Sequence, residues 1–171
     1  PLIHNLTKVS EEWGTFQCRR YIITATEHCA RIGFAYATKN HTSQEAADVV
    51  SALFASFPAK TEFILTDNGS EFMKHFQDEL DRHEVTHWHT YPRTPKMNAH
   101  CERFNRTIQE EFVDYYHPLL KNDLPAFNHK LADWLVWYNT ERPHWSLKLR
   151  SPIQFILEEF PSESRIGWAD T

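Results

Sequence analysis

The chain has 171 residues, of which 41% are hydrophobic and 24% are charged, with only 4 glycines. This composition is typical of a single packed globular domain over residues 1–171, and it excludes disordered, collagenous and low-complexity classes. Three cysteines without a CxxC spacing favour free thiols over a disulfide framework, and no apolar run reaches the roughly 18 residues of a membrane span. Free thiols indicate a reducing compartment, so we expect a cytoplasmic protein, located with the nucleoid if it is bacterial. Because the chain begins at Pro1 and not at a methionine, we expect a fragment of a longer protein.

The charge is distributed unevenly. A net charge of −5 argues against nucleic-acid binding, because phosphate contacts usually need a basic surface. Residues 87–106 nevertheless carry four basic residues and one acid, Glu102. The net charge of this segment is therefore +3, and that of the rest of the chain is −8. The four are Arg93, Lys96, Arg103 and Arg106. A DNA-facing patch and an ordinary solvated face both remain open as explanations.

The first half of the chain predicts an α/β fold. Three stretches rich in β-branched and aromatic residues predict an antiparallel meander over about residues 2–9, 19–26 and 31–37. Thr42 and Glu45 have the spacing of a capping box, and the helix that they begin must end before Pro58. The apolar run 62–66 then predicts a strand buried on both faces and parallel to its neighbour.

The second half predicts four helices and one strand. The first helix covers about 70–83, with Phe72, Met73, Phe76 and Leu80 on one face, and a short strand follows at 85–89. The next helix runs from Asn98 to about 117. Its apolar stripe consists of Cys101, Phe104, Ile108, Phe112 and Tyr115. Asp123 and Ser151 are the expected caps of the last two helices.

Two carboxylates are expected at one edge of the sheet. Asp67 ends a buried strand, and the following helix and strand return the chain to the same edge, where the helix carrying Glu102 begins. Ligands bind at the carboxyl ends of strands in open α/β sheets. Paired carboxylates repel unless a cation lies between them, and Mg²⁺ and Mn²⁺ prefer such oxygen ligands. The pair therefore predicts a divalent-metal site.

Each of these features also has a structural explanation. Asp67 begins Asp-Asn-Gly, one of the commonest turn signals, so a turn role is the alternative. His87 and His89 alternate on one predicted strand, but they lack the spacing of a zinc site. Trp134, Trp137 and Tyr138 have helical spacing and are predicted to belong to the core more than to a base-stacking surface.

Three motifs taken together resemble one family. They are TDNGSEF at 66–72, PRTPKMNAHCERFNRTIQEEF at 92–112 and WYNTERPHWSLKLRSPIQF at 137–155. In this order they resemble the catalytic core of insertion-sequence transposases related to retroviral integrases, over about residues 2–157. The resemblance implies a ribonuclease-H-like fold: a mixed five-stranded sheet, an antiparallel meander followed by parallel strands, flanked by helices, with further helices at the C-terminal end.

The resemblance also implies a function. It implies an Asp-Asp-Glu site in which Asp67 and Glu102 are catalytic metal ligands for two Mg²⁺ or Mn²⁺ ions, which promote phosphoryl transfer on DNA without a covalent protein intermediate. Arg93, Lys96, Arg103, Asn105 and Arg106 are the expected DNA-binding residues. The implied partners are DNA and further copies of the full-length protein, with no membrane and no small-molecule cofactor. The helix-turn-helix module that recognises transposon ends is expected to be missing from this chain.

Leu6 is the departure from the family pattern. Family members place their first Asp in a run similar to His-x-Asp-Thr-Lys, which here reads His4-Asn5-Leu6-Thr7-Lys8. Leucine offers no lone pair to a metal, so we expect the chain as written to be inactive. Glu27, on the neighbouring strand, is the alternative third carboxylate. Two other functions remain open: a non-enzymatic remnant for oligomerisation or DNA scaffolding, and a structure-selective nuclease, which Leu6 also disfavours.

Overall fold

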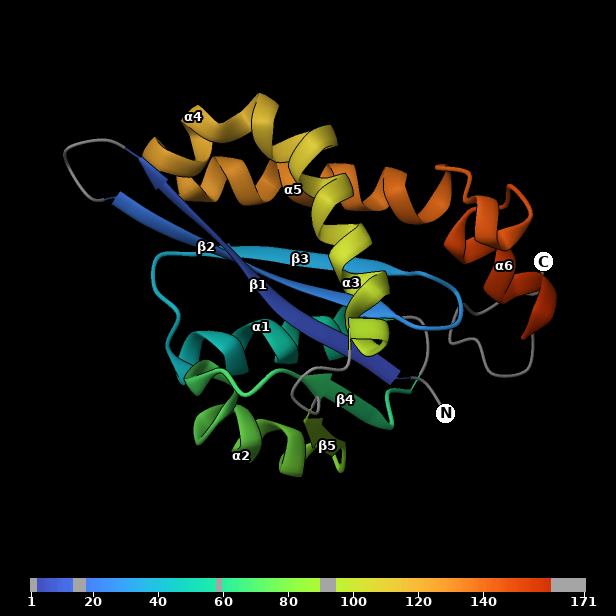
Figure 1. Cartoon of the computed structure of the whole chain (residues 1–171), viewed down its shortest axis with the longest axis horizontal. Coiled ribbons are helices and arrows are strands. Elements are labelled where there is room, and N and C mark those ends of the chain that lie inside the picture. Colours follow the sequence, from blue (N-terminus) through green and yellow to red (C-terminus); the bar gives the residue numbers. More distant parts are fainter. Residues whose placement is uncertain (1–2, 14–17, 58–59, 90–94, 161–171) are drawn as a thin grey trace, which may run out of the picture.

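The computed structural model describes residues 3–13, 18–57, 60–89 and 95–160, with side chains at 19–57, 60–89 and 99–160. Its centre is a five-stranded sheet with the order β3-β2-β1-β4-β5 (Figure 1). The strands are β1 (Ile3–Trp13), β2 (Cys18–Glu27), β3 (Gly33–Thr38), β4 (Phe63–Thr66) and β5 (Thr86–His89). The first three pair antiparallel, and β4 and β5 continue the sheet parallel to β1. The predicted α/β class is confirmed.

The first helix follows β3, the second follows β4, and the remaining helices follow β5. They are α1 (Ser43–Ser56), α2 (His75–Arg82), α3 (Pro95–Ile108), α4 (Asp114–Asn122), α5 (Leu124–Thr140) and α6 (Pro152–Glu159). Short 3-10 turns cover Ser70–Phe72 and Trp145–Leu147, and a π-helical turn covers Gln109–Val113. The predicted capping box of α1 is present, since Thr42 accepts the amide of Glu45 and Glu45 bonds back to Thr42.

The sheet separates two apolar cores. Neighbouring residues of a strand point to opposite faces, so Ile22 and Ile23 of β2 enter different clusters. Ile23 packs with the helices α1, α2 and α6, whereas Ile22 packs with α3, α4, α5 and the π-helical turn. Each large side chain that is fully buried stabilises the fold by about 1.5–3 kcal/mol. Strand β2 is thus held from both sides, and Ile64 and Leu65 of β4 are both buried, as predicted for the strand over 62–66.

Two asparagine side chains of α5 form hydrogen bonds with the backbone groups at the outer edge of β3. The Asn139 side chain accepts from the amide of Gly33 and donates to its carbonyl, both at 2.9 Å. Asn128 makes the same pair of bonds with Ala37, also at 2.9 Å. An edge strand otherwise exposes such groups to pairing with other chains. These side chains therefore fix α5 along β3.

We expect Asn139→Ala to destabilise the fold because it leaves both backbone groups of Gly33 without these bonds. The loss should be about 1–3 kcal/mol in the free energy of unfolding, measured by urea denaturation. Thr140→Ala on the same helix is the control, since it gains similar helix propensity without touching the strand. An equal effect of the two substitutions would refute a structural role for Asn139.

Two predicted helices differ from those observed. The helix expected at 70–83 is split, because Lys74 has φ 44° between the 3-10 turn and α2. Met73, predicted on its apolar face, is 42% exposed. The helix expected at 98–117 starts earlier and contains the π-helical turn, which buries both Phe112 and Val113. This turn shifts the phase of the stripe, so Tyr115 is 75% exposed and the prediction for it was wrong.

Candidate active site

The end of β4 lies beside the start of β1, the central strand. The parallel register pairs Leu6 with Thr66, and Asp67 is the next residue along the chain. On its other side Leu6 pairs with Ala25 of β2. Leu6 on β1 and Asp67, the first residue after β4, thus adjoin each other at the edge where β4 ends, the usual ligand position of such sheets.

The turn after β4 shapes the surroundings of Asp67. Asp67 is exposed, and its Oδ1 accepts the amide proton of Gly69 at 2.9 Å. A Cβ atom on Gly69 would lie 2.7 Å from Oε2 of Glu71 and 3.0 Å from Oδ1 of Asp67. A side chain at position 69 would therefore have to displace the carboxylate of Glu71. Asp67 acts as a turn residue through one oxygen, and this leaves its second oxygen for a cation.

A hydrogen-bond chain supports the last residue of β4. Gln77 donates its amide nitrogen to Asp81 at 2.7 Å, so its Oε1 accepts the Nδ1 proton of His87, also at 2.7 Å. His87 Nε2 then lies 2.8 Å from the hydroxyl of Thr66. Burial, with a smaller contribution from His89, lowers the pKa of His87 to about 4, so the ring is neutral at pH 7. The network positions the residue before Asp67.

Helix α3 carries Glu102 across the same part of the sheet. Cys101 and Phe104 are buried beneath it, and the helix contacts both β1 and β2, as Figure 1 shows where α3 crosses in front of β1. The Thr24 hydroxyl of β2 donates to Oδ1 of Asn105 at 2.6 Å. Glu102 is exposed, and no ion pair to it or to Asp67 is present among the described residues. Asn105 thus anchors the helix, and its predicted DNA contact stays a prediction.

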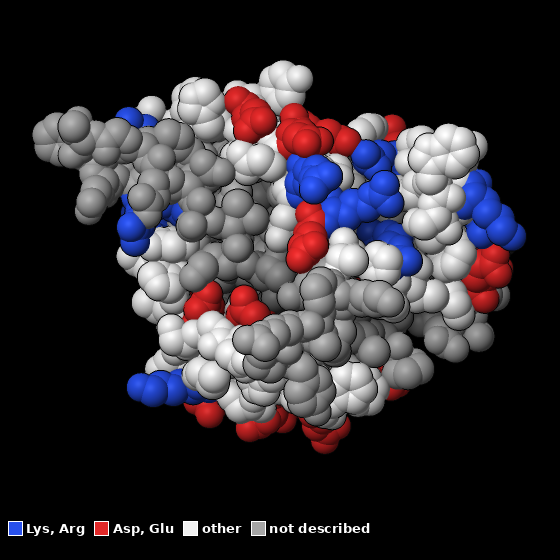
Figure 2. Space-filling view, in the orientation of Figure 1, with Lys and Arg blue, Asp and Glu red and all other residues white. Residues whose placement is uncertain are grey.

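The predicted basic residues are only partly visible. Arg103 and Arg106 are exposed on α3. Arg93 lies outside the described residues, and of Lys96 only the helical backbone is described. Figure 2 shows Lys and Arg side chains gathered where α3 meets the end of α5, with acidic side chains beside them. Arg31 and Arg142, which the sequence did not single out, line a pocket with Arg103 in this region.

Glu27 does not replace the missing carboxylate. It pairs with His4 rather than with Leu6, about two residues or roughly 7 Å along the strand. Its side chain is 1% exposed and accepts the backbone amides of Cys29 and Ala30 in the turn after β2. Burial raises its pKa despite these bonds. Glu27 is therefore a structural residue of the turn.

Metal-ligand geometry is incomplete in the described part of the chain. There, no group of three or more His, Cys, Asp or Glu side chains is arranged to hold a metal ion. His87 and His89, whose ring centroids lie 4.1 Å apart, belong to no such group among the described residues. The carboxylates Asp67 and Glu102 have the oxygen chemistry that Mg²⁺ and Mn²⁺ prefer, but Leu6 stands where a third would be expected.

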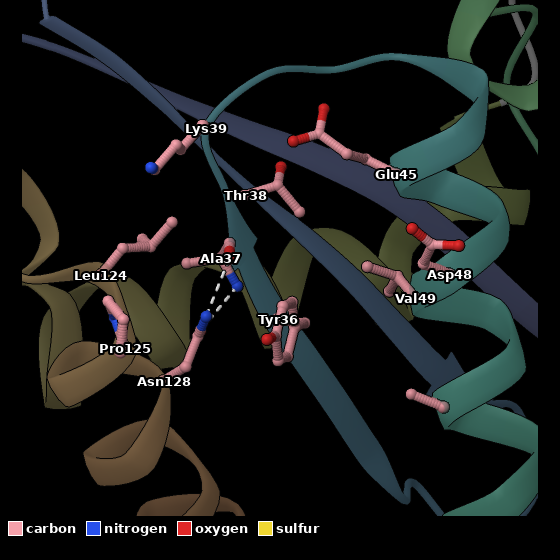
Figure 3. Close-up of a pocket in the computed structure, with 11 residues that line it drawn as sticks. Tyr36, Ala37, Thr38, Lys39, Glu45, Asp48, Val49, Leu124, Pro125 and Asn128 are labelled. Atoms are coloured by element: carbon pink, nitrogen blue, oxygen red, sulfur yellow. Dashed lines mark hydrogen bonds between the residues drawn. The ribbon is translucent and has the colours of Figure 1, made fainter.

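Another pocket lies elsewhere among the described residues. It encloses about 490 Å³ between β3, α1 and α5. Figure 3 shows Asn128 reaching from α5 to Ala37, with Glu45 and Asp48 on the opposite wall. None of the predicted site residues lines it. This pocket therefore has no direct part in chemistry at Asp67.

The five-stranded sheet and its helices have the fold of an integrase core domain. The chain belongs to the integrase core domain family, whose sequence model matches residues 6–95, and a second integrase core domain model matches residues 83–152. The catalytic core domain of BIV integrase has a TM-score of 0.68 at 18% identity, covering 92% of this chain and 94% of that one. The HTLV-2 integrase catalytic core domain in complex with magnesium (trimeric form) has a TM-score of 0.69 at 16% identity, covering 90% and 94%.

Sequence relatives point to the same family. "Putative integrase ORF3" of Spiroplasma virus SpV1-C74 is 26% identical over 153 residues, covering 80% of this chain and 41% of that protein. The insertion element IS476 uncharacterized 39.2 kDa protein of Xanthomonas euvesicatoria is 31% identical over 106 residues, covering 61% and 29%. The chain thus spans less than half the length of these curated relatives. None of the described helices is both long and apolar enough to cross a membrane.

Proposed function

We propose that the chain is the DNA-binding catalytic core of an integrase-type transposase whose cleavage and strand-transfer chemistry is disabled by Leu6. The observation that carries the proposal is the strand register, which sets Leu6 beside Thr66 and next to Asp67. In an integrase-type site this is a position for a metal-bridging carboxylate. The domain would act wherever its DNA is, which in a bacterium is the cytoplasm.

Asp67 and Glu102 are the residues that would hold a divalent ion. When bound, Mg²⁺ or Mn²⁺ supplies charge stabilisation and an activated water or 3′-hydroxyl for in-line phosphoryl transfer. Asp67 would contribute the oxygen that Gly69 does not occupy, while α3 presents Glu102. The Thr66–His87–Gln77 network would keep Asp67 in place during DNA binding. With two carboxylates, metal affinity should be weak.

The surface of α3 supports the DNA part of the proposal. Arg103 and Arg106 are exposed, and neither has an ion pair among the described residues, so their charge is available to phosphates. The net charge of −5 opposes this local attraction. The isolated chain should therefore bind duplex DNA weakly and with little sequence preference.

The basic patch should control this affinity. We expect the joint replacement of Arg93, Lys96, Arg103 and Arg106 by Ala to weaken duplex binding. The slope of the logarithm of the binding constant against the logarithm of the salt concentration should become shallower by roughly 0.9 for each phosphate that is no longer neutralised. Fluorescence anisotropy across a salt series measures both. Replacing Lys121 and Lys130 by Ala, on α4 and α5, is a control that removes exposed cations elsewhere. Unchanged binding by the quadruple variant would make the patch an ordinary solvated face.

A non-enzymatic scaffold is the second candidate, and Leu6 favours it. Such a remnant would keep the fold, assemble with further copies and bind DNA without cutting it. The HTLV-2 catalytic core is described in dimeric and trimeric forms. A strand-cleavage assay of the parent and of Leu6→Asp with Mn²⁺ separates the two, since only a disabled enzyme should regain cleavage when the carboxylate returns.

A further inference from the structure

A second pocket lies beside the basic surface of α3. It encloses about 330 Å³ between the turn after β2, α3 and the segment that joins α5 to α6. Arg31, Arg103 and Arg142 contribute to its walls. Its volume is within the range of small-molecule sites and exceeds what a single phosphate needs.

The cations around this pocket are poorly neutralised. Arg142 is bonded to Glu111 through two contacts at 2.6 and 3.0 Å, but Arg103 has no ion pair among the described residues. Arg31 also lines the pocket, and Glu27, the acid whose charge acts on it, already accepts two backbone amides through its carboxylate oxygens. A cluster of cations that outnumbers its acidic partners is suited to a phosphate.

Two buried polar atoms line the same pocket without partners. Nε2 of His144 and Oγ1 of Thr26 make no hydrogen bond to the described residues, although these residues are only 9% and 4% exposed. The backbone of Tyr138 bonds the other nitrogen of His144, and burial lowers its pKa to about 4. The neutral ring therefore presents a lone pair at Nε2. A ligand here must carry an N–H or O–H donor as well as a negative charge.

Trp145 forms the open rim of the pocket. It is 87% exposed, which is unusual for the largest apolar side chain. Indole rings beside cations are the surfaces on which unpaired bases stack. The rim, the walls and the polar atoms thus offer separate partners for a base and for a phosphate.

We propose that this pocket binds one unpaired nucleotide of a DNA strand, with its phosphate between Arg31 and Arg103 and its base against Trp145. A base N–H group then donates to Nε2 of His144. A paired base cannot enter, because it must leave the duplex to reach a pocket. The inference rests on the proposed function, since it takes DNA as the ligand, and adds a preference for strands with unpaired ends.

Three labelled DNA molecules test the proposal by fluorescence anisotropy at one salt concentration. They are a blunt duplex, the same duplex with a short single-stranded extension, and that duplex with an extension of abasic residues. The intact extension should raise affinity about tenfold over the blunt duplex, in line with stacking of one base. Trp145→Ala should abolish this gain and Trp145→Phe should keep most of it. Tyr115→Ala, another exposed aromatic residue, should leave the gain unchanged.

The outcomes separate this inference from the proposed function. An abasic extension that binds as tightly as the intact one, or a Trp145→Ala variant that keeps the gain, overturns the nucleotide pocket while leaving duplex binding in place. No binding to any of the three DNAs overturns the proposed function and this inference together. A free deoxynucleoside monophosphate that binds as tightly as the extension would assign the pocket to free nucleotides and overturn its link to DNA.

Discussion

Leu6→Asp should give the protein a thermal stability that depends on divalent metal. The new carboxylate would stand on the central strand beside Thr66 and next to Asp67, the position set by the parallel register. With Glu102 it would complete three carboxylates for Mg²⁺ or Mn²⁺. At a metal concentration about 100 times the dissociation constant, preferential binding to the native state adds about 2.7 kcal/mol. For a chain of this size that raises Tm by roughly 5–10 °C.

The same substitution should destabilise the fold when metal is removed, because the added anion repels Asp67. Thermal melting of the parent and the variant with Mn²⁺ and with a chelator measures both effects. Leu6→Asn is the matched control, since it has nearly the shape of Asp without the charge. Adding Asp67→Asn to Leu6→Asp should remove the response again. If the parent and Leu6→Asp respond equally to Mn²⁺, Leu6 does not occupy the position of the third ligand.

Local sequence signals predicted most elements because each has a local cause. The capping box at Thr42 and Glu45 begins α1, and the side chains of Asp123 and Ser151 cap α5 and α6 as expected. The apolar run before Asp67 became β4, parallel to β1. The predictions for Met73 and Tyr115 were wrong because a positive φ at Lys74 and the π-helical turn shift the helical phase, and periodicity carries no sign of either.

The candidate site also has one part that the sequence predicted and one part that it did not. The motif around Asp67 located the edge of the sheet, and the topology explains why Leu6 lies beside it. Long-range contacts were not predictable. His87 of β5 hydrogen-bonds Thr66 of the neighbouring strand β4. Arg31 and Arg103 line one pocket because the turn after β2 packs beside α3. The burial of His144, in the Arg-Pro-His-Trp run at 142–145, was not predicted because it depends on tertiary structure.

The fold should lose stability steadily as the pH falls from about 6.5 to about 4. The cause is a pair of histidines, His87 and His144, whose pKa values burial lowers to about 4. In the unfolded chain these rings take up protons near pH 6.5, whereas in the folded chain they stay neutral until about pH 4. The unfolded state therefore binds more protons across this window, and acid favours it.

The size of the effect follows from the shift in pKa. One pKa unit corresponds to 1.36 kcal/mol, but the two rings are not fully enclosed and solvent screens their charges, so each should contribute about 1–3 kcal/mol. Glu27 acts in the opposite direction, because burial raises the pKa of its carboxyl and protonation then favours the folded state. Its contribution stabilises the fold as the pH falls through the raised pKa toward 4.5 and offsets part of the loss.

Urea denaturation at a series of pH values measures the loss, and His87→Gln should make the dependence on pH shallower because one of the two rings no longer titrates. His129→Gln is the control, since this ring is 80% exposed on α5 and should leave the slope unchanged. NMR titration of the imidazole carbons in the unaltered protein provides a readout that does not depend on a variant folding. If all the histidines titrate near pH 6.5, burial does not hold His87 neutral, and the stability of the residue before Asp67 must have another source.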